Sequence, residues 1–530
     1  MLTMEGLLLV VVLGATVLVG TTIGRRYSVA PPVLLITFGG LLGLIPALGD
    51  VHVPPDVVLL LFLPAILYWE SLNTSLREIR SNLRVIILSA VVLVIVTMVA
   101  VSYTLQAAGV VASAAWILGA VLAPTDAAAV AGLAKRMPRR TLTTLRAESL
   151  INDGTALVLY AVAVGALLSG HVPGPALLVG ELVYSSAAAV VVGLVCGYGV
   201  VFIRRYLDSP QIEGGLSILT PFIAFLVAEV IHTSGVVAVV VSGLVLSWAG
   251  PRVIRARSRL EAYSFWDLGT FMLNGSLFVL VGLQIPNALR GISSVTVGHA
   301  VAIAFLTAGA VIVTRLVWVH AVAWLIRLLD RRPVQRTRRV NWKVRTAGGW
   351  AGFRGAVSLA AALAVPVTLD DGSTYTERDL IIFCTTVVIV VTVLLQGTTL
   401  PMVVRWAGLA EGDQEREEET RQARLRATEV ALAALPEIAA RFGAPDEVAD
   451  RIRADYQGHL DTLRSEGAEH GVQAWQDQVD RRVRLEVLDR KRRAVTRMRD
   501  DREIDDIVLR DLQSSMDIEE VRLLGPAPTD

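Results

Sequence analysis

The sequence predicts an all-α polytopic membrane protein with about thirteen transmembrane helices, followed by a helical cytoplasmic C-terminal domain. Of its 530 residues, 54% are hydrophobic and only 18% are charged. The apolar residues are gathered in long runs, each near the roughly 20 residues that a helix needs to cross a bilayer. This pattern excludes a soluble globular protein, whose surface needs more charge.

Thirteen spans are predicted, and the charges of their connecting loops test that number. Basic residues gather in alternate loops, whereas the intervening loops contain little beyond Arg290 and Arg378. Because cytoplasmic loops collect Lys and Arg, we expect a multi-pass plasma-membrane protein with its N-terminus outside and its C-terminus in the cytoplasm. The predicted spans are residues 5–23, 30–48, 55–74, 83–107, 113–134, 141–169, 175–203, 214–232, 234–249, 263–287, 294–327, 345–367 and 378–408.

The charge distribution divides the chain into two predicted domains, 1–410 and 411–530. The first contains 29 basic and 19 acidic residues, and the second contains 20 basic and 29 acidic residues. We therefore expect a transmembrane domain followed by a cytoplasmic tail, in which apolar residues recur at helical spacing. The acidic run at 413–422 is most simply a solvated helix start. Cys196 and Cys384 lie in apolar runs, so no disulfide framework is expected.

Charged side chains inside the predicted spans are candidates for function, because a charge in hydrocarbon is costly. Glu181 and Asp267 lie near span ends, where a side chain can reach the interface, so neither needs a functional explanation. Glu229 lies deeper, and both interpretations stay open for it. The full set is Glu70, Asp126, Glu148, Asp153, Glu181, Glu229, Asp267, Arg315 and Arg354.

Two predicted spans are interrupted at equivalent places in the two halves of the membrane domain. In the fifth span, Pro124 disfavours helix at the preceding residue, and Thr125 and Asp126 follow it at the break. In the twelfth span, four glycines surround Arg354. The thirteen predicted spans divide into six spans, one linking span and six further spans. The proline-interrupted span is the fifth of the first six, and the glycine-interrupted span is the fifth of the second six. Paired interruptions predict two inverted six-helix repeats with discontinuous helices that cross at a transport site. A proline kink capped by Asp126 is the alternative for the fifth span.

The sixth predicted span carries a group of polar residues. Ser149 and Asp153 are four residues apart, so they share one helix face and can share a ligand. Asp153 can hold either a cation or a proton, and its neighbour Asn152 adds polarity without a second proton. Glu148 points elsewhere and needs a partner of its own. A hydrogen-bonded packing role for Asn152 and Asp153 is the alternative.

Together these motifs resemble the monovalent cation:proton antiporter-1 family, in its bacterial NhaP-like branch related to animal sodium/proton exchangers. The resemblance covers nearly all of residues 5–408 and leaves out the tail. It rests on Pro124-Thr125-Asp126, on Glu148-Ser149-Leu150-Ile151-Asn152-Asp153-Gly154, on AEVIHTSGVVAVVVSGLVLS at 228–247, and on Gly352-Phe353-Arg354-Gly355.

The resemblance implies electroneutral exchange of a monovalent cation for H+ by elevator-like alternating access, in the service of pH homeostasis. Na+ is the expected cation, and Li+ and K+ remain open because all three take oxygen ligands. Asp153 would bind cation or proton in competition, with Asp126, Ser149 and the Thr125 backbone as further Na+ ligands. The Asn152-Asp153 pair resembles the electroneutral branch. The family also implies a homodimer with core and dimerisation subdomains, and we expect no cofactor.

The resemblance assigns supporting roles to three more charges and departs from the family at a fourth. Glu148 would pair with Arg315 in the eleventh span, and Arg354 would support the helix crossing. In the third span, the family's Leu-Pro-Pro is followed by an acid four residues after the second proline. Here Ala65 replaces that proline, and Glu70 lies one position late, about 100° around a helix. Whether Glu70 faces the ion is therefore left open.

Two other classes of function compete with a transporter. A membrane-embedded enzyme would need catalytic clusters on loops or a sizeable soluble domain on one face, and the outer loops are short and lack such clusters. A cation channel or membrane sensor could use the broken helices to line a pore, and it would pass ions without proton counterflow. The expected partners are monovalent cations, protons, the lipid bilayer and a second copy of the chain, with no nucleic acid.

Overall fold

The structure is a computed structural model, and its secondary-structure elements are all helices in the part of the chain that it describes. One isolated β-bridge, between Thr368 and Thr374, is the sole strand-like pairing recorded there. The prediction of an all-α membrane protein is confirmed. The described residues are 4–27, 29–45, 57–126, 139–170, 174–292, 295–329, 341–369, 372–409, 412–465, 472–501, 503 and 506–524.

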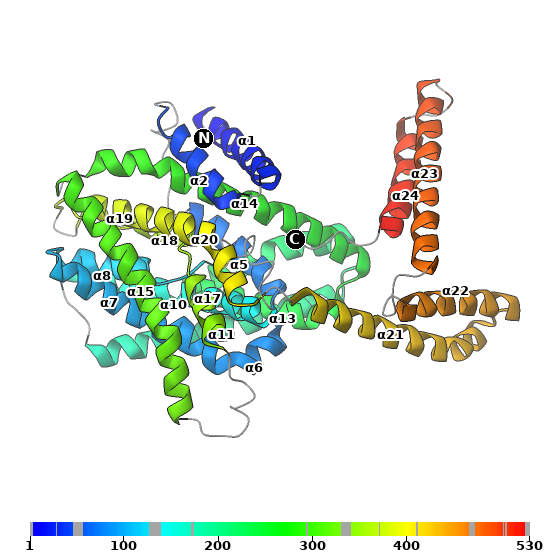
Figure 1. The fold of residues 1–530 in the computed structure, drawn as a ribbon, viewed down its shortest axis with the longest axis horizontal. Helices are drawn as coiled ribbons and strands as arrows, with labels where there is room; N and C mark the ends of the chain where they lie inside the picture. The colour runs from blue at the N-terminus through cyan, green and yellow to red at the C-terminus, as the bar shows by residue number, and fades with distance from the viewer. Residues whose placement is uncertain are drawn as a thin grey trace. The chain divides into compact units, whose positions relative to one another are not determined.

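The chain forms two compact units, Met1–Gly412 and Asp413–Asp530. The helices of the first unit are drawn from blue to yellow in Figure 1. They are α1 (Met4–Tyr27), α2 (Pro31–Leu42), η1 (Val58–Phe62), α5 (Leu63–Leu72), α6 (Leu76–Ile87), η2 (Leu88–Val92), α7 (Leu93–Ala107), α8 (Ala112–Val121), α10 (Arg139–Ser169), α11 (Pro175–Arg204), α12 (Pro210–Val230), α13 (Gly235–Val253), α14 (Ala256–Gly291), α15 (Val297–Leu329), α17 (Trp342–Trp350), α18 (Ala356–Leu363), α19 (Arg378–Val391), η4 (Thr392–Gln396) and α20 (Gly397–Trp406).

Nine helices among the described residues are long and apolar enough to cross a membrane. Shorter apolar helices occupy Pro31–Leu42, Val58–Leu72 and Ala112–Val121. All of them overlap predicted spans, while the count of thirteen and the inverted repeat stay predictions. The nine are Gly6–Tyr27, Asn82–Ala107, Thr144–Ser169, Gly180–Arg204, Pro210–Val230, Gly235–Val253, Ala256–Gly291, Val297–Leu325 and Arg378–Trp406.

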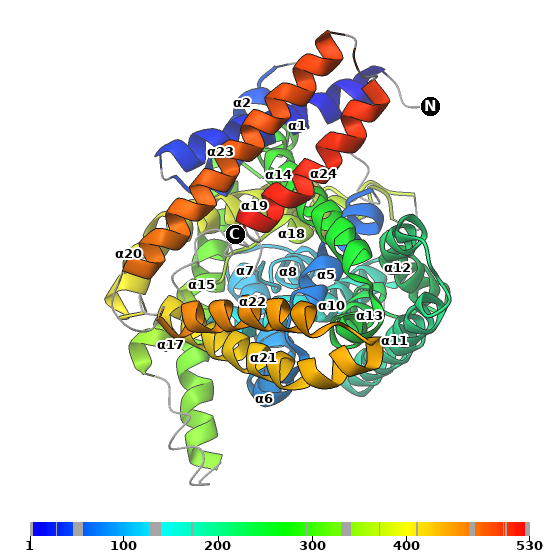
Figure 2. The same cartoon turned by 90° about the vertical axis from the view of Figure 1, so that its right-hand side faces the viewer.

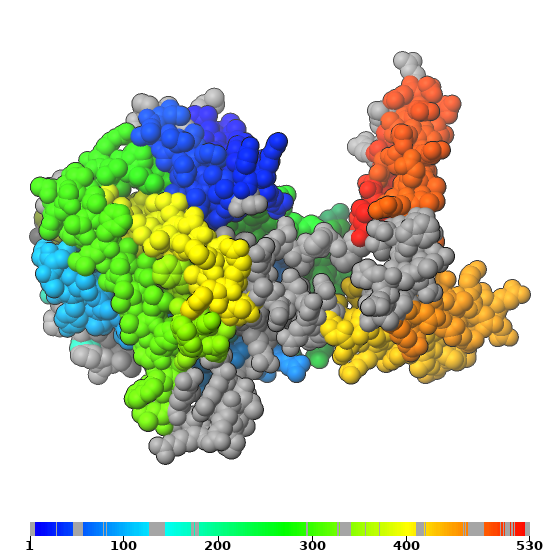
Figure 3. Space-filling model, in the orientation of Figure 1, coloured from blue at the N-terminus to red at the C-terminus, as the bar shows by residue number. Residues whose placement is uncertain are grey.

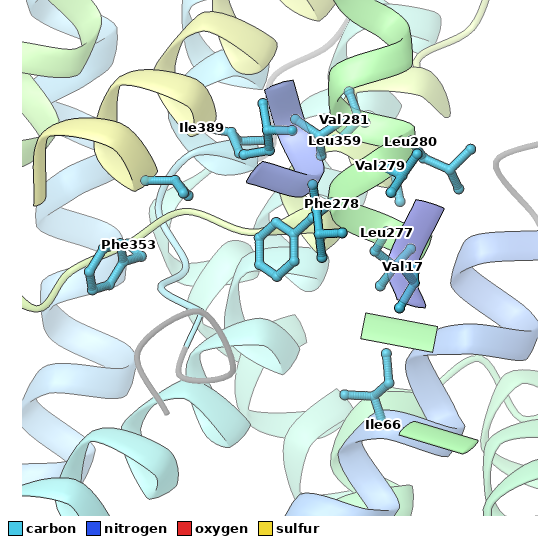
Figure 4. Packing of buried hydrophobic residues seen from close by; sticks show 14 of the residues in the cluster. Val17, Ile66, Leu277, Phe278, Val279, Leu280, Val281, Phe353, Leu359 and Ile389 are labelled. Carbon is cyan, nitrogen blue, oxygen red and sulfur yellow. The ribbon is translucent and has the colours of Figure 1, made fainter. Parts of the chain in front are cut away.

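A large apolar cluster joins α1, α2 and α14 to the helices around the broken spans. The backbones of α2 and α14 approach so closely that only glycine fits at two positions. A Cβ at Gly39 would overlap the carbonyl of Val279, and a Cβ at Gly282 would overlap the carbonyl of Ile36. Figure 3 shows the side chains of α1 and α2 in a continuous surface with those of α14. Figure 4 shows the buried side chains of this cluster, which include Val279.

Helix α10 lies at the centre of the membrane unit. It contacts α6, α8, α13 and α18, which are helices from both halves of the sequence, and Figure 2 shows it among its neighbours. A second apolar cluster, formed largely by α8, α15 and α19, packs on the same region. Side chains on α10 are therefore held by packing on several sides.

Both predicted interruptions are present at the positions that the sequence indicates. The fifth span leaves helical geometry after Val121, and residues 122–126 continue without helix. Its predicted continuation to residue 134 lies outside the described residues. The twelfth span ends as α17 at Trp350 and resumes as α18 at Ala356. Pro124 and the glycines of the twelfth span thus mark real breaks.

The second unit consists of α21 (Gly412–Phe442), α22 (Asp446–Ser465), α23 (Val472–Asp500) and α24 (Asp506–Leu524). Arg464 of α22 pairs with Glu429 of α21 at 3.1 Å. Arg492 of α23 pairs with Asp517 and Glu520 of α24 at 2.6 and 2.5 Å. Near the start of α21, hydrogen bonds from Arg421 and Gln422 lower the pKa of Glu418 to about 2. That exposed carboxylate is therefore anionic throughout the physiological pH range.

Candidate functional site

The two helix breaks cross and bond to each other through their backbones. The amide of Asp126 donates to the carbonyl of Phe353 at 2.9 Å. Arg354 is buried, and its guanidinium donates to the carbonyl of Ala123 at 2.6 Å and to that of Pro124. A break inside a membrane frees carbonyls that lipid cannot satisfy. Arg354 supplies donors to two carbonyls of the fifth-span break, at the crossing where the resemblance places it.

Gly355 gives the Asp126 side chain room at this crossing. A Cβ at position 355 would overlap the carboxylate of Asp126. The other glycines of the broken span have different surroundings, because a Cβ at Gly348 would meet nothing within 4 Å. The position of Asp126 therefore depends on one particular glycine of the four.

A cavity opens beside the crossing and brings four of the predicted ligands together. Glu70 of α5, Asp126 of the fifth-span break, and Ser149 and Asp153 of α10 all line it. Its volume is about 480 Å³, including the open space at its mouth. Carboxylate and hydroxyl oxygens suit hard cations. Among the described residues, no group of three or more His, Cys, Asp or Glu side chains converges as at a resident metal site. The other lining residues are Val58, Leu59, Phe62, Leu63, Ile66, Leu67, Asn274, Leu277, Val357 and Ala360.

Glu70 faces this cavity despite its displaced position in the sequence motif. Leu59, Leu63, Ile66 and Glu70 recur three or four residues apart, so they form one stripe of the helix that lines the cavity. Ile66 is labelled in Figure 4 and also belongs to the core. Trp69, which occupies the family's acidic position, instead packs edge-on against Tyr263 with ring centroids 5.2 Å apart. The helical spacing of these apolar residues therefore predicts that the Glu70 carboxylate faces the cavity.

Asp153 borders a second, smaller cavity as well as the first. Along α10, Ser149 belongs to the first cavity, while Ala156, Leu157 and Tyr160 belong to the second. These residues are three or four apart along α10, so they lie on one face of the helix. The first cavity therefore lies on the N-terminal side of Asp153 along this face, and the second lies on its C-terminal side. The residues from α8 and α18 that line the second cavity are apolar.

Asn152 and Thr125 contact each other and line neither of the two cavities. The Asn152 amide donates to the Thr125 hydroxyl at 2.8 Å, and both side chains are buried. This bond ties the fifth-span break to α10. The side chain of Asn152 thus positions Thr125, and its own amide oxygen is buried without a hydrogen-bond partner among the described residues.

Glu148 and Arg315 form a buried ion pair away from the cavity lining. Their charged atoms, Oε1 and Nη1, are 2.5 Å apart, and the side chains are 6% and 3% exposed. Space for Arg315 depends on Gly352, because a Cβ there would overlap the arginine side chain. The structure therefore places Glu148 beside Arg315, the partner that the resemblance implies for it.

The remaining charged candidates are not part of the site. Glu181, Glu229 and Asp267 are exposed on α11, α12 and α14. Two further features were missed by a search for charges within spans. Arg204 and Glu213 form a buried ion pair at 3.9 Å at the ends of two helices, where the predicted span limits placed them in loops. Asn274 lines the first cavity, and a search that included uncharged polar residues would have found it.

Comparisons with known proteins agree with this geometry. Residues 13–406 match a family described as sodium/hydrogen exchanger, transmembrane. The chain belongs to the sodium/hydrogen exchanger family. This exchanger is 53% identical to an uncharacterized Na(+)/H(+) exchanger of Mycobacterium tuberculosis (strain H37Rv), over 98% of this chain and 97% of that protein. It is 29% identical to the Na(+)/H(+) antiporter ApNhaP of Aphanothece halophytica, over 77% of this chain and 75% of that protein.

The fold of the exchanger is also found in a solved structure. The sodium proton antiporter MjNhaP1 from Methanocaldococcus jannaschii at pH 8 aligns with a TM-score of 0.59 and 20% sequence identity. The alignment covers 77% of this exchanger and 100% of that chain. At this level of identity the likeness shows a common fold.

Proposed function

We propose that this exchanger is a secondary active transporter, not an enzyme, that exchanges a monovalent cation, Na+ in the first instance, for H+ across the plasma membrane. Its family and the names of its relatives support cation/proton exchange and do not support a channel or sensor. The observation that carries the proposal is the position of Asp153 in a cavity beside two crossing helix breaks. Crossed, discontinuous helices are typical of ion sites in secondary transporters.

In the proposed mechanism, Asp153 holds either the cation or a proton. Asp126 and Ser149 supply further oxygens to the cation, as does the Thr125 backbone, while Glu70 completes the acidic lining from α5. Arg354 fixes the broken backbone that carries Asp126, and the Glu148–Arg315 pair stays structural. The N-terminus lies outside, the C-terminus lies in the cytoplasm, and a homodimer provides a fixed frame for alternating access. No cofactor is needed, because the cation and the proton are both cargo.

The donor set is compatible with Na+, Li+ or K+, so the cation is best identified by transport. Purified exchanger in proteoliposomes would receive each cation in turn, with the membrane potential clamped, while internal pH is recorded. We expect Na+ to drive proton movement. Proton movement without any dependence on a monovalent cation would contradict the proposal, as would cation flux without proton counterflow.

Exchange is expected to be insensitive to membrane potential. If Asp153 binds one cation or one proton, a full cycle exchanges one positive charge for another. Asp126 is expected to stay charged in both states, and Asn152 cannot titrate. Protons should also compete with the cation, so its apparent affinity should weaken as pH falls. Initial Na+-driven rates measured at potentials set by K+ and valinomycin test this, once K+ is shown not to be a substrate. A reproducible change of rate with potential would point to a second titrating group.

Gly355→Ala is expected to impair transport through Asp126. Its new Cβ would overlap the Asp126 carboxylate, so one of the two must shift. A displacement of about 1 Å can cost on the order of 100-fold in a positioned site, and we expect a loss of about 10- to 100-fold in cation-driven rate. Gly348→Ala is the matched control, because its Cβ meets nothing within 4 Å. Equal activity of the two variants would contradict the placement of Asp126.

A further inference from the structure

One polar side chain of the cavity comes from a helix that carries none of the proposed ligands. Asn274 of α14 lines the cavity together with Glu70, Asp126, Ser149 and Asp153. The other cavity residue of α14 is Leu277, one turn further along, so the helix presents a single amide in an otherwise apolar face. Leu277 is labelled in Figure 4, where it packs within the core.

The Asn274 amide makes no hydrogen bond to any residue that the structure describes, although the side chain is half-buried. Polar groups inside a protein are normally bonded to protein or to water. Other polar side chains around the site do have partners, as Asn152 does in Thr125. The interior of the cavity is therefore the natural place for a partner of Asn274.

An asparagine side chain can serve a cation in two ways. Its carbonyl oxygen is a common ligand of hard cations, and its NH2 group can donate to a carboxylate. It is neutral at every working pH, so it can bind the cation without taking up a proton. A proton on Asp153, in contrast, needs no further oxygen ligand from α14.

We propose that Asn274 binds the transported cation through its side-chain oxygen and helps to determine which cation is accepted. This inference rests on the proposed function, in which the same cavity holds the cation at Asp153. Asn274 lies on α14 and Asp153 lies on α10. The distance between the Asn274 oxygen and the Asp153 carboxylate therefore determines the size of the ion that both can contact. Loss of the amide should weaken cation binding and leave proton binding unchanged.

The test compares Asn274→Leu with Gln284→Leu in proteoliposomes. Gln284 is another half-buried amide on α14, and it does not line either cavity. At a fixed alkaline pH, Asn274→Leu should raise the apparent KM for Na+ about tenfold, the effect of losing one hydrogen-bond-like contact to a charge. The maximal rate should be retained, and the ratio of KM values for Li+, Na+ and K+ should change. Gln284→Leu should match the parent in all of these.

Asn274→Ala and Asn274→Gln guard against a variant that fails to fold. Alanine should raise KM as leucine does, whereas glutamine should retain binding with a different ratio among the three cations. Unchanged KM values in all folded Asn274 variants would overturn the inference, as would a fall in maximal rate alone. These contradicting results would remove only the role of Asn274 if the parent still exchanges cations for protons and Asp153→Asn does not. If the parent itself shows no cation/proton exchange, the proposed function has failed.

Discussion

Asp153→Asn is expected to reduce cation-driven proton movement to the level of protein-free liposomes while the protein remains folded. Asparagine has nearly the same shape as aspartate, so it can fill the same place between the two cavities that Asp153 lines. It carries no charge for the cation and cannot release a proton at working pH. Both halves of the proposed exchange should therefore be lost together. The measurement is the initial rate of internal pH change after Na+ addition.

The matched control for this variant is Asp267→Asn. Asp267 lies exposed on α14, and it lines neither cavity. Its replacement should leave the rate within about twofold of the parent, because Asp267 lines neither cavity. It should also leave the protein folded, because exposed substitutions usually change the unfolding free energy by about 0.5 kcal/mol or less. Size-exclusion profiles and thermal unfolding would show that both variants are folded. Substantial exchange by Asp153→Asn would contradict the assignment of Asp153 as the residue that carries the cation and the proton.

Removal of either Glu148 or Arg315 is expected to destabilise the protein strongly. The two side chains are 6% and 3% exposed and their charged atoms are 2.5 Å apart, so each neutralises a charge that would otherwise be buried alone. Loss of one partner from a buried pair typically costs about 3–5 kcal/mol. We expect Glu148→Gln and Arg315→Gln to lower the unfolding temperature in detergent by several degrees. The double variant should recover part of the loss, because no unpaired charge remains.

An exposed ion pair provides the comparison for this prediction. Arg257 and Glu261 on α14 are 3.2 Å apart and lie one helical turn from each other, with side chains 82% and 47% exposed. Such pairs contribute about 0–1 kcal/mol, so Glu261→Gln should barely change the unfolding temperature. If Glu148→Gln behaved in the same way, the buried pair could not have the structural role assigned to it.

Local chemistry made several features of the site predictable from the sequence. Pro124 cannot continue a helix and the glycines of the twelfth span weaken one, so both breaks could be placed before the fold was known. Glu148 and Arg315 are costly as lone charges in lipid, which predicted that each has a partner. The four-residue spacing of Ser149 and Asp153 predicted a common face, and both line the same cavity.

Other features depend on how separate helices meet, and spacing along one helix does not determine them. Asn152 adjoins Asp153 in the sequence, and only the packing of the fifth-span break against α10 shows that its amide is directed to the Thr125 hydroxyl. Glu70 was left open from its motif, whereas its register with Leu63 and Ile66 places it in the cavity wall. Asn274 comes from a span without charged candidates deep inside it, so a search for charges passed over it.

Proton release on cation binding tests the central claim most directly. Purified exchanger in weakly buffered detergent solution would be titrated with Na+ while a pH indicator reports released protons. If Asp153 holds either a proton or a cation, the parent should release up to one proton per bound cation, and the apparent cation affinity should fall as pH falls. Asp153→Asn should neither bind the cation nor release the proton. Cation binding by the parent without proton release at any pH would contradict the account.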